Sequence, residues 1–106
     1  MAREKFQTLT EQMFYILLAL KNECCGMDIM SKVQELTGGR VKIGPGTLYN
    51  LLEQFKSAKL IEEVSSEGRR KNYVITSKGI DALKEEYLRL QEQISDYEAL
   101  FCSTDR

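Results

Sequence analysis

The sequence predicts a mostly α-helical fold with one small β-hairpin. Three stretches with helical apolar spacing precede the hairpin, and a long helix with an unbroken heptad stripe follows it. The helix directly before the hairpin has one apolar face and one face of short polar side chains, and the hairpin tip is cationic. This order indicates a winged helix-turn-helix domain over residues 1–76 and a C-terminal dimerisation helix over residues 77–106, together one compact unit.

The first helix is predicted to begin at a capping box, in which Thr8 is followed three residues later by Glu11. We expect it to run to about Asn22. Between Met13 and Leu20 it carries no charged or amide side chain, and a helix that is apolar all round must be covered all round. In a domain of this size, a second subunit would cover the face that the core does not.

A second helix is predicted from Met27 to Thr37, and Gly38-Gly39 ends it. Its apolar positions are expected to face the core: Ile29, Met30, Val33 and Leu36. Residues 40–43 then form a link that is longer than the turn of a simple helix-turn-helix unit. The link leaves two cations, Arg40 and Lys42, just before the third helix.

Pro45, the only proline, suits the first position of the third helix because that position needs no N–H donor, and Gly44 is an acceptable N-cap. Four apolar residues fall on its core face: Leu48, Leu51, Leu52 and Phe55. Polar residues lie roughly opposite, with Tyr49 and Glu53 at the flanks: Thr47, Asn50, Gln54 and Ser57. Asn and Gln can read adenine edges in the major groove, and Thr can contact a thymine methyl. Taken alone, the same residues would also suit any surface helix.

The hairpin consists of two β-favouring runs, Ile61–Ser65 and Asn72–Thr76, joined by a loop in which Gly68 supplies the turn. Three consecutive cations lie at its tip: Arg69, Arg70 and Lys71. They would repel one another without an anionic partner, and phosphate oxygens are the natural one. A solvated charged turn is the alternative, but the position directly after a groove-reading helix favours double-stranded DNA.

The charge is divided unevenly along the chain. The net charge of −1 is unusual for a DNA-binding domain, which is expected to be basic. Residues 1–79 hold 12 Lys and Arg against 9 Asp and Glu, a net of +3, whereas residues 80–106 hold 3 against 7, a net of −4. The positive charge therefore lies with the predicted DNA surface, and the acidic last segment should face away from it.

Composition argues against several other classes. The chain has no histidine and its three cysteines lack a CxxC spacing, so we expect no zinc site and no cofactor. No nucleophile lies near a base in the pattern, so an enzyme is not expected. The amino end does not resemble a signal peptide, and no apolar stretch is long enough to span a membrane. An odd number of cysteines fits a reduced, cytoplasmic protein.

The last helix is expected from Ser77 or Lys78 to about Phe101. Its apolar positions alternate in spacings of three and four: Ile80, Leu83, Tyr87, Leu90, Ile94, Tyr97 and Phe101. Charged residues, among them Glu86 and Arg89, are expected on the other faces. The helix could pack on its own domain, but such a domain offers no groove about 30 Å long. We therefore expect a dimer interface to which the first helix contributes: Met13, Leu17, Leu83, Tyr87, Leu90, Ile94, Tyr97 and Phe101.

Four segments resemble the PadR family of bacterial transcriptional regulators: Gly26–Ile29, Gly38–Ile43, Pro45–Tyr49 and Gly68–Tyr73, with Thr76 and Gly79. The resemblance covers about Leu9 to Phe101, and the single C-terminal helix is similar to the short subfamily. It implies a homodimeric repressor of an inverted-repeat operator, with a small apolar or aromatic effector at the dimer interface. It also implies a set of DNA contacts: Lys42, Thr47, Tyr49, Asn50, Arg69, Arg70 and Lys71. The polar face of the third helix adds Gln54 to this set.

Three positions depart from the family pattern. Gly44 stands where relatives commonly have serine, Asn72 occupies an often aromatic position, and Leu90 lies near the place of a ligand-stacking tryptophan. Because the chain has no tryptophan, other aromatic residues would line an effector cavity: Phe14, Tyr15, Tyr87 and Tyr97. The leading interpretation is a DNA-binding repressor. The alternative is a winged-helix module that binds only protein.

Overall fold

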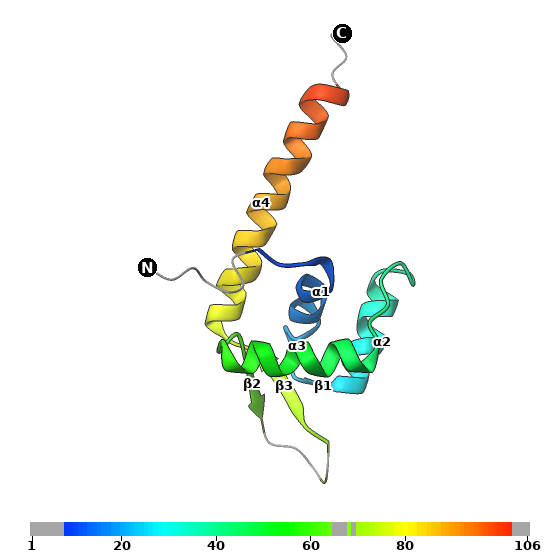
Figure 1. Ribbon diagram of the computed structural model, residues 1–106, viewed down its shortest axis with the longest axis vertical. Helices are drawn as coiled ribbons and strands as arrows, with labels where there is room; N and C mark the ends of the chain where they lie inside the picture. The colour runs from blue at the N-terminus through cyan, green and yellow to red at the C-terminus, as the bar shows by residue number, and fades with distance from the viewer. Residues whose placement is uncertain (1–7, 65–67, 69, 103–106) are drawn as a thin grey trace.

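The computed structural model describes residues 8–64, 68 and 70–102. Within them, four helices and a three-stranded antiparallel sheet confirm the predicted mostly α fold with a small hairpin. Along the chain the elements are α1 (Glu11–Ala19), β1 (Cys24–Cys25), α2 (Gly26–Leu36), α3 (Pro45–Ser57), β2 (Ile61–Val64), β3 (Asn72–Ile75) and α4 (Ser77–Phe101). The long helix α4 rises from one side of the molecule, and the β2–β3 hairpin extends from the opposite side (Figure 1).

The central strand of the sheet is β3, which pairs antiparallel with β1 on one side and β2 on the other. Tyr73 lies opposite Glu63 of β2 and opposite Cys24 of β1. The predicted hairpin is confirmed, and β3 ends one residue early because Thr76 caps α4. The predicted end of the other strand at Ser65 lies outside the described residues. The two-residue strand β1 was not predicted, because so short a segment shows no alternation.

A single hydrophobic core joins the first three helices to the sheet. Its largest fully buried side chains come from all three helices and the residue after α1: Phe55, Ile16, Leu17, Leu20, Ile29, Leu48, Leu52 and Val33. The predicted core face of α3 is confirmed, because its four apolar residues are all buried. The prediction for Leu17 is wrong: its side chain is 0% exposed within its own protomer, so it has no surface to offer a partner subunit.

The amino end of α1 differs from the prediction. Thr10 is the N-cap, and its Oγ1 accepts a hydrogen bond from the Met13 N–H at 3.2 Å. The capping box between Thr8 and Glu11 is therefore not formed, because Glu11 is already the first helical residue. The two threonines are equally good caps by type.

The carboxyl end of α1 comes three residues before the predicted Asn22, at Ala19. The next carbonyl, that of Leu20, accepts a hydrogen bond from the Ile75 N–H of β3 at 2.9 Å. The chain then pairs with β3 as β1, and this pairing ends the helix.

In α2 the inward position predicted for Leu36 is wrong, since that side chain is 61% exposed. Thr37 is buried in its place, one helical turn after Val33. Its Oγ1 donates to the Val33 carbonyl at 2.8 Å and accepts from the Val41 N–H at 3.0 Å. These bonds fix the turn that leads through Gly38 and Gly39, both at positive φ as predicted for a helix end.

The start of α4 is confirmed at Ser77. The Oγ1 of Thr76 accepts a hydrogen bond from the Gly79 N–H at 3.1 Å, and a β-carbon on Gly79 would lie 2.2 Å from the Leu60 carbonyl oxygen. Only glycine allows this close approach. The first turns of α4 therefore pack on the domain, whereas residues 91–102 are all exposed.

Glu86 of α4 is a second correction, because it is 3% exposed rather than solvated. Its Oε1 accepts a hydrogen bond from the Leu9 N–H at 3.0 Å, and its other oxygen pairs with Arg89. Arg89 therefore neutralises a buried carboxylate and is not a simple outer-face charge. The pair ties the segment before α1 to the middle of α4.

Candidate nucleic-acid interface

The helix α3 presents its polar face to solvent. Pro45 is the first helical residue and Gly44 is the N-cap without a side-chain bond, as predicted. Most of the predicted contact residues in and before α3 are exposed: Lys42, Thr47, Tyr49 and Asn50. Gln54 is half-buried and therefore offers less surface.

Two of the three predicted wing cations belong to the described residues. Arg70 and Lys71 are exposed and directly precede β3. Gly68 has φ +63°, the left-handed conformation that the turn requires. The third cation, Arg69, lies outside the described residues. Asn72, at the base of the wing, donates from its Nδ2 to a Glu23 carboxylate oxygen at 2.9 Å.

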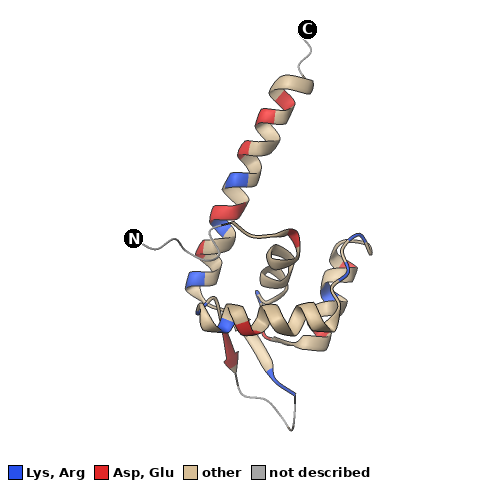
Figure 2. Ribbon diagram, viewed as in Figure 1, with Lys and Arg blue, Asp and Glu red and all other residues tan. Residues whose placement is uncertain are grey.

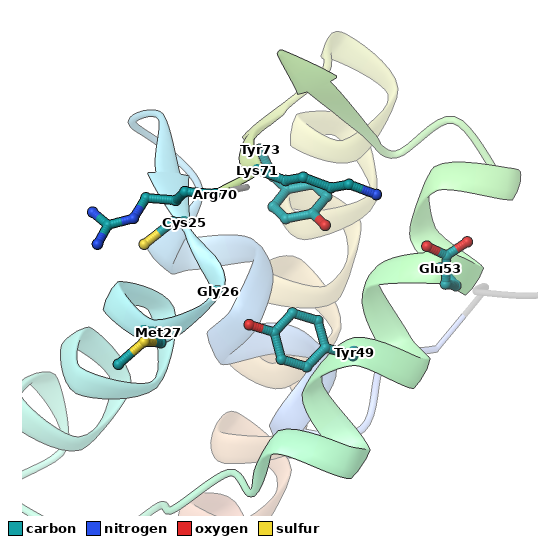
Figure 3. A pocket seen from close by; sticks show the side chains of 8 residues that line it. All are labelled: Cys25, Gly26, Met27, Tyr49, Glu53, Arg70, Lys71 and Tyr73. Carbon is teal, nitrogen blue, oxygen red and sulfur yellow. The ribbon is translucent and has the colours of Figure 1, made fainter. Parts of the chain in front are cut away.

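A pocket of about 440 Å³ lies between α3, the start of α2 and the wing (Figure 3). Its lining residues are Cys25, Gly26, Met27, Tyr49, Glu53, Arg70, Lys71 and Tyr73. The structure thus brings together three of the predicted DNA contacts, Tyr49, Arg70 and Lys71. The other predicted residues of α3 lie outside this pocket.

Tyr49 lies across the first residue of α2. A β-carbon on Gly26 would lie 2.3 Å from the Tyr49 hydroxyl oxygen and 2.7 Å from the ring carbon that carries it. Tyr49 nevertheless remains 44% exposed. Its hydroxyl therefore points to the amino end of α2, where Cys25 is the N-cap without a side-chain hydrogen bond.

Sequence reasoning missed Tyr73, which is 4% exposed and lines the same pocket. Figure 3 shows its hydroxyl pointing into the space between the wing and α3. The hydroxyl has no hydrogen bond to a described residue, and because no buried polar atom among these residues lacks a partner, it is open to solvent in the pocket. Burial raises the pKa of Tyr73 above its usual value, with Glu63 acting in the same direction, so it stays protonated and able to donate.

An ion pair connects α3 to β2 beside the pocket. The Lys56 Nζ donates to Glu63 at 2.9 Å and lies 3.5 Å from a carboxylate oxygen of Glu53. The hydrogen bond from Lys56 lowers the pKa of Glu63, and Lys71 adds a smaller effect in the same direction. Both carboxylates near the pocket are thus paired, whereas neither of the described wing cations forms an ion pair with a described residue.

The charges are only partly separated over the molecule, because the wing strand β2 carries Glu62 and Glu63 and is red in Figure 2. Lys and Arg residues mark the wing side of β3 in Figure 2, whereas acidic residues recur along the distal half of α4. Before α3, the Arg40 guanidinium donates to the Tyr15 hydroxyl at 3.1 Å. The hydrogen bond to Tyr15 raises the pKa of Arg40. This hydrogen bond connects Arg40, in the loop before α3, to α1.

A family model described as the transcriptional regulator PadR-like family matches residues 16–85, a segment that contains α3, the wing and the pocket. The chain belongs to this family. PadR-family regulators are DNA-binding transcription factors and not enzymes.

Solved structures support the same fold. A PadR-family transcriptional regulator from Eggerthella lenta superposes with a TM-score of 0.71 at 21% identity, over 87% of this chain and 78% of that chain. A complex structure of RosR-S1 of H. salinarum gives 0.64 at 26% identity, over 86% and 78%. ZitR of Lactococcus lactis, a cysteine-to-serine mutant in complex with DNA, gives 0.63 at 21% identity, over 99% and 69%. Among curated proteins, none matches the chain.

In the part that the structure describes, no three His, Cys, Asp or Glu side chains gather as they would around a metal ion. No helix among the described residues has the length and apolarity needed to cross a membrane.

The apolar stripe of α4 in this PadR-like regulator is largely uncovered. Ile80, Tyr87, Ile94, Tyr97 and Phe101 are between 52% and 76% exposed. Met13 on α1 and Leu83 and Leu90 on α4 are half-buried. Near the carboxyl end, the rings of Tyr97 and Phe101 stack with centroids 5.4 Å apart. These side chains are exposed enough to contact a second subunit.

Proposed function

We propose that this PadR-like chain is a cytoplasmic homodimeric repressor that binds an inverted-repeat DNA operator. The observation that supports the proposal is the pocket itself, which is lined both by Tyr49 of α3 and by the wing cations Arg70 and Lys71. Helix and wing thus form one continuous surface, as a duplex requires.

The proposed contacts divide into two kinds. Thr47 and Asn50 are exposed on α3, have no charge and suit base edges in the major groove. Arg69, Arg70 and Lys71 of the wing, with Lys42 before α3, suit phosphate oxygens. Gln54 is half-buried and is assigned to the margin of the surface.

Dimerisation is proposed through α4. An exposed stripe of large apolar side chains on a helix of 25 residues has no partner within the described chain over its distal half. A second copy of the same helix would cover it with matching heptad spacing. The two α3 helices would then read half-sites whose centres lie about 34 Å apart, one helical turn of DNA.

A small apolar or aromatic effector is proposed at the dimer interface, to which α1 and α4 contribute. Phe14 and Tyr15 form an edge-to-face pair with ring centroids 5.6 Å apart, and both are half-buried. Tyr87 of α4 is 52% exposed, and its hydroxyl accepts a hydrogen bond from Gln91 at 3.0 Å. These rings offer the aromatic surface that such a ligand would contact.

The decisive experiment is selection of binding sites from a random DNA pool by the full chain, followed by sedimentation of the complex. The expected result is a palindromic site bound by two copies of the chain. A module that binds only protein would recover no preferred sequence at moderate salt, and that result would reject the repressor.

A further inference from the structure

The pocket between α2, α3 and the wing contains a group of donors that base reading does not use. Tyr49 and Tyr73 line it together with the cations Arg70 and Lys71; the Tyr49 hydroxyl is turned to the start of α2, and the Tyr73 hydroxyl lies nearer the wing. Tyr73 is the most informative member, because the residue is only 4% exposed and its hydroxyl points into the pocket. It has no hydrogen bond to a described residue, and since no buried polar atom among them lacks a partner, this hydroxyl is open to the pocket and free to donate to a ligand.

The backbone of α2 adds further donors at the same place. Gly26 and Met27, the first two residues of α2, line the pocket, and the first N–H groups of a helix have no partner inside the helix. The N-cap, Cys25, supplies no side-chain oxygen to them. Because Gly26 has no side chain, the Tyr49 hydroxyl can approach this helix end closely.

The charge balance around the pocket favours a singly charged anion. Three cations, Arg70, Lys71 and Lys56, stand against two carboxylates, Glu53 and Glu63, a local net charge of +1. A phosphodiester carries one negative charge, whereas a phosphate monoester carries nearly two at neutral pH. The volume of about 440 Å³ leaves room for an attached sugar beside the phosphate.

We infer that this pocket holds one backbone phosphodiester of the bound DNA, with its oxygens accepting hydrogen bonds from the Tyr49 and Tyr73 hydroxyls, Arg70 and the first N–H groups of α2. The inference rests on the proposed function and changes the role of one residue within it. Tyr49 holds the backbone and does not read a base.

Methylphosphonate scanning tests this phosphate directly. The probe is the duplex recovered by selection, with each phosphate replaced in turn by a neutral methylphosphonate. With the parent protein, a methylphosphonate at one position in each half-site should weaken binding about tenfold, as expected when a charged acceptor is removed. This position should differ from the phosphates that only the wing contacts. Tyr73→Phe and Tyr49→Phe should each weaken binding to the unmodified duplex several-fold. For these two variants, a methylphosphonate at that position should cause little further loss of affinity compared with the unmodified duplex.

Tyr15→Phe is the matched control, since its hydroxyl pairs with Arg40 and does not line the pocket. In this variant the same methylphosphonate should remain as harmful as in the parent. If both pocket variants bind the unmodified duplex as tightly as the parent, the inference is wrong while the repressor stands. If the parent recovers no DNA sequence, both fail.

A free anion such as inorganic phosphate is the alternative ligand for this pocket. In amide NMR spectra, the duplex should shift the signals of Gly26 and Met27, and inorganic phosphate at millimolar concentration should not. Saturable shifts with inorganic phosphate, without shifts from the duplex, would overturn the assignment to the DNA backbone.

Discussion

The hydroxyl of Tyr49 lies 2.3 Å from the point where a β-carbon on Gly26 would stand. Gly26 is not among the described glycines with positive φ, so its backbone does not demand glycine. The space that it leaves is taken by a side chain from another helix. The contact brings the start of α2 close to α3 at the pocket.

Gly26→Ala should therefore separate stability from DNA affinity. Alanine is the better helix former by up to about 1 kcal/mol, so the melting temperature should not fall. The Tyr49 ring must turn away, so the affinity for all DNA sequences should fall. Adding Gly26→Ala to Tyr49→Ala should cost no further affinity. Independent effects in the double variant would show that the two residues are not coupled.

The wing cations and Asn50 should differ in what they contribute. Arg70→Ala or Lys71→Ala should weaken binding to every sequence and make the salt slope shallower by about one unit for each phosphate that is no longer bound. Asn50→Ala should cost about 1–3 kcal/mol on the selected operator alone. Titrations at several salt concentrations distinguish them, with Lys78→Ala as an exposed cation control on α4. Unchanged selectivity in Asn50→Ala would exclude it from base reading.

The exposed stripe of α4 gives a test of the dimer. Ile94 is 57% exposed, so Ile94→Glu leaves the protomer's core intact but places a carboxylate in the proposed seam. It should dissociate the dimer at micromolar concentration and abolish operator binding while every DNA-binding residue is still present. Ser95→Glu adds the same charge to the neighbouring outer position and should leave the dimer intact. Equal sedimentation of both variants as dimers would place the seam elsewhere.

Arg89 should be needed for stability because it neutralises the buried Glu86. Arg89→Ala should lower the free energy of unfolding by about 1–3 kcal/mol, the cost of an inadequately paired buried group. Adding Glu86→Gln should recover part of this free energy, since the amide oxygen can still accept from the Leu9 N–H. Denaturation at fixed protein concentration measures both, and Lys84→Ala is the exposed control on α4. A destabilisation no larger than that of the control would contradict this role.

Gly79 should tolerate no side chain. A β-carbon there would meet the Leu60 carbonyl at 2.2 Å, and a backbone atom cannot move aside cheaply. Gly79→Ala should destabilise the protein by about 1–3 kcal/mol despite the better helix propensity. Gly46→Ala is the matched control, because nothing lies within 4 Å of its β-carbon position. The two melting temperatures should move in opposite directions.

The elements with strong local patterns were predictable from the sequence. Pro45 and the four apolar residues after it determine where α3 begins and which face is buried. The seven-residue stripe likewise defined α4, from Ser77 to Phe101. In both cases the pattern repeats over several turns, so neighbouring residues support the same assignment.

Features that depend on distant contacts were not predictable. Glu86 resembles any glutamate on a helix surface, and its burial depends on an N–H that lies 77 residues away in the chain. Tyr73 looks like any strand tyrosine by type, and only the approach of α2 and α3 makes it part of a pocket. Thr8 and Thr10 could not be distinguished as caps, because both are equally good caps by residue type.

The attachment of α4 has a mechanical consequence. The helix is 25 residues long, or about 37 Å at 1.5 Å per residue, and its contacts with the domain described above lie in its first half, at Gly79, Leu83 and Glu86. In the proposed dimer it would act as a lever, held by the partner over its distal half and carrying the DNA-reading domain at its first turns. A tilt of a few degrees between two paired levers would shift each α3 by roughly 2–3 Å over that length, about one hydrogen-bond distance. Small changes between the subunits would then be enough to take both reading helices out of register with consecutive major grooves.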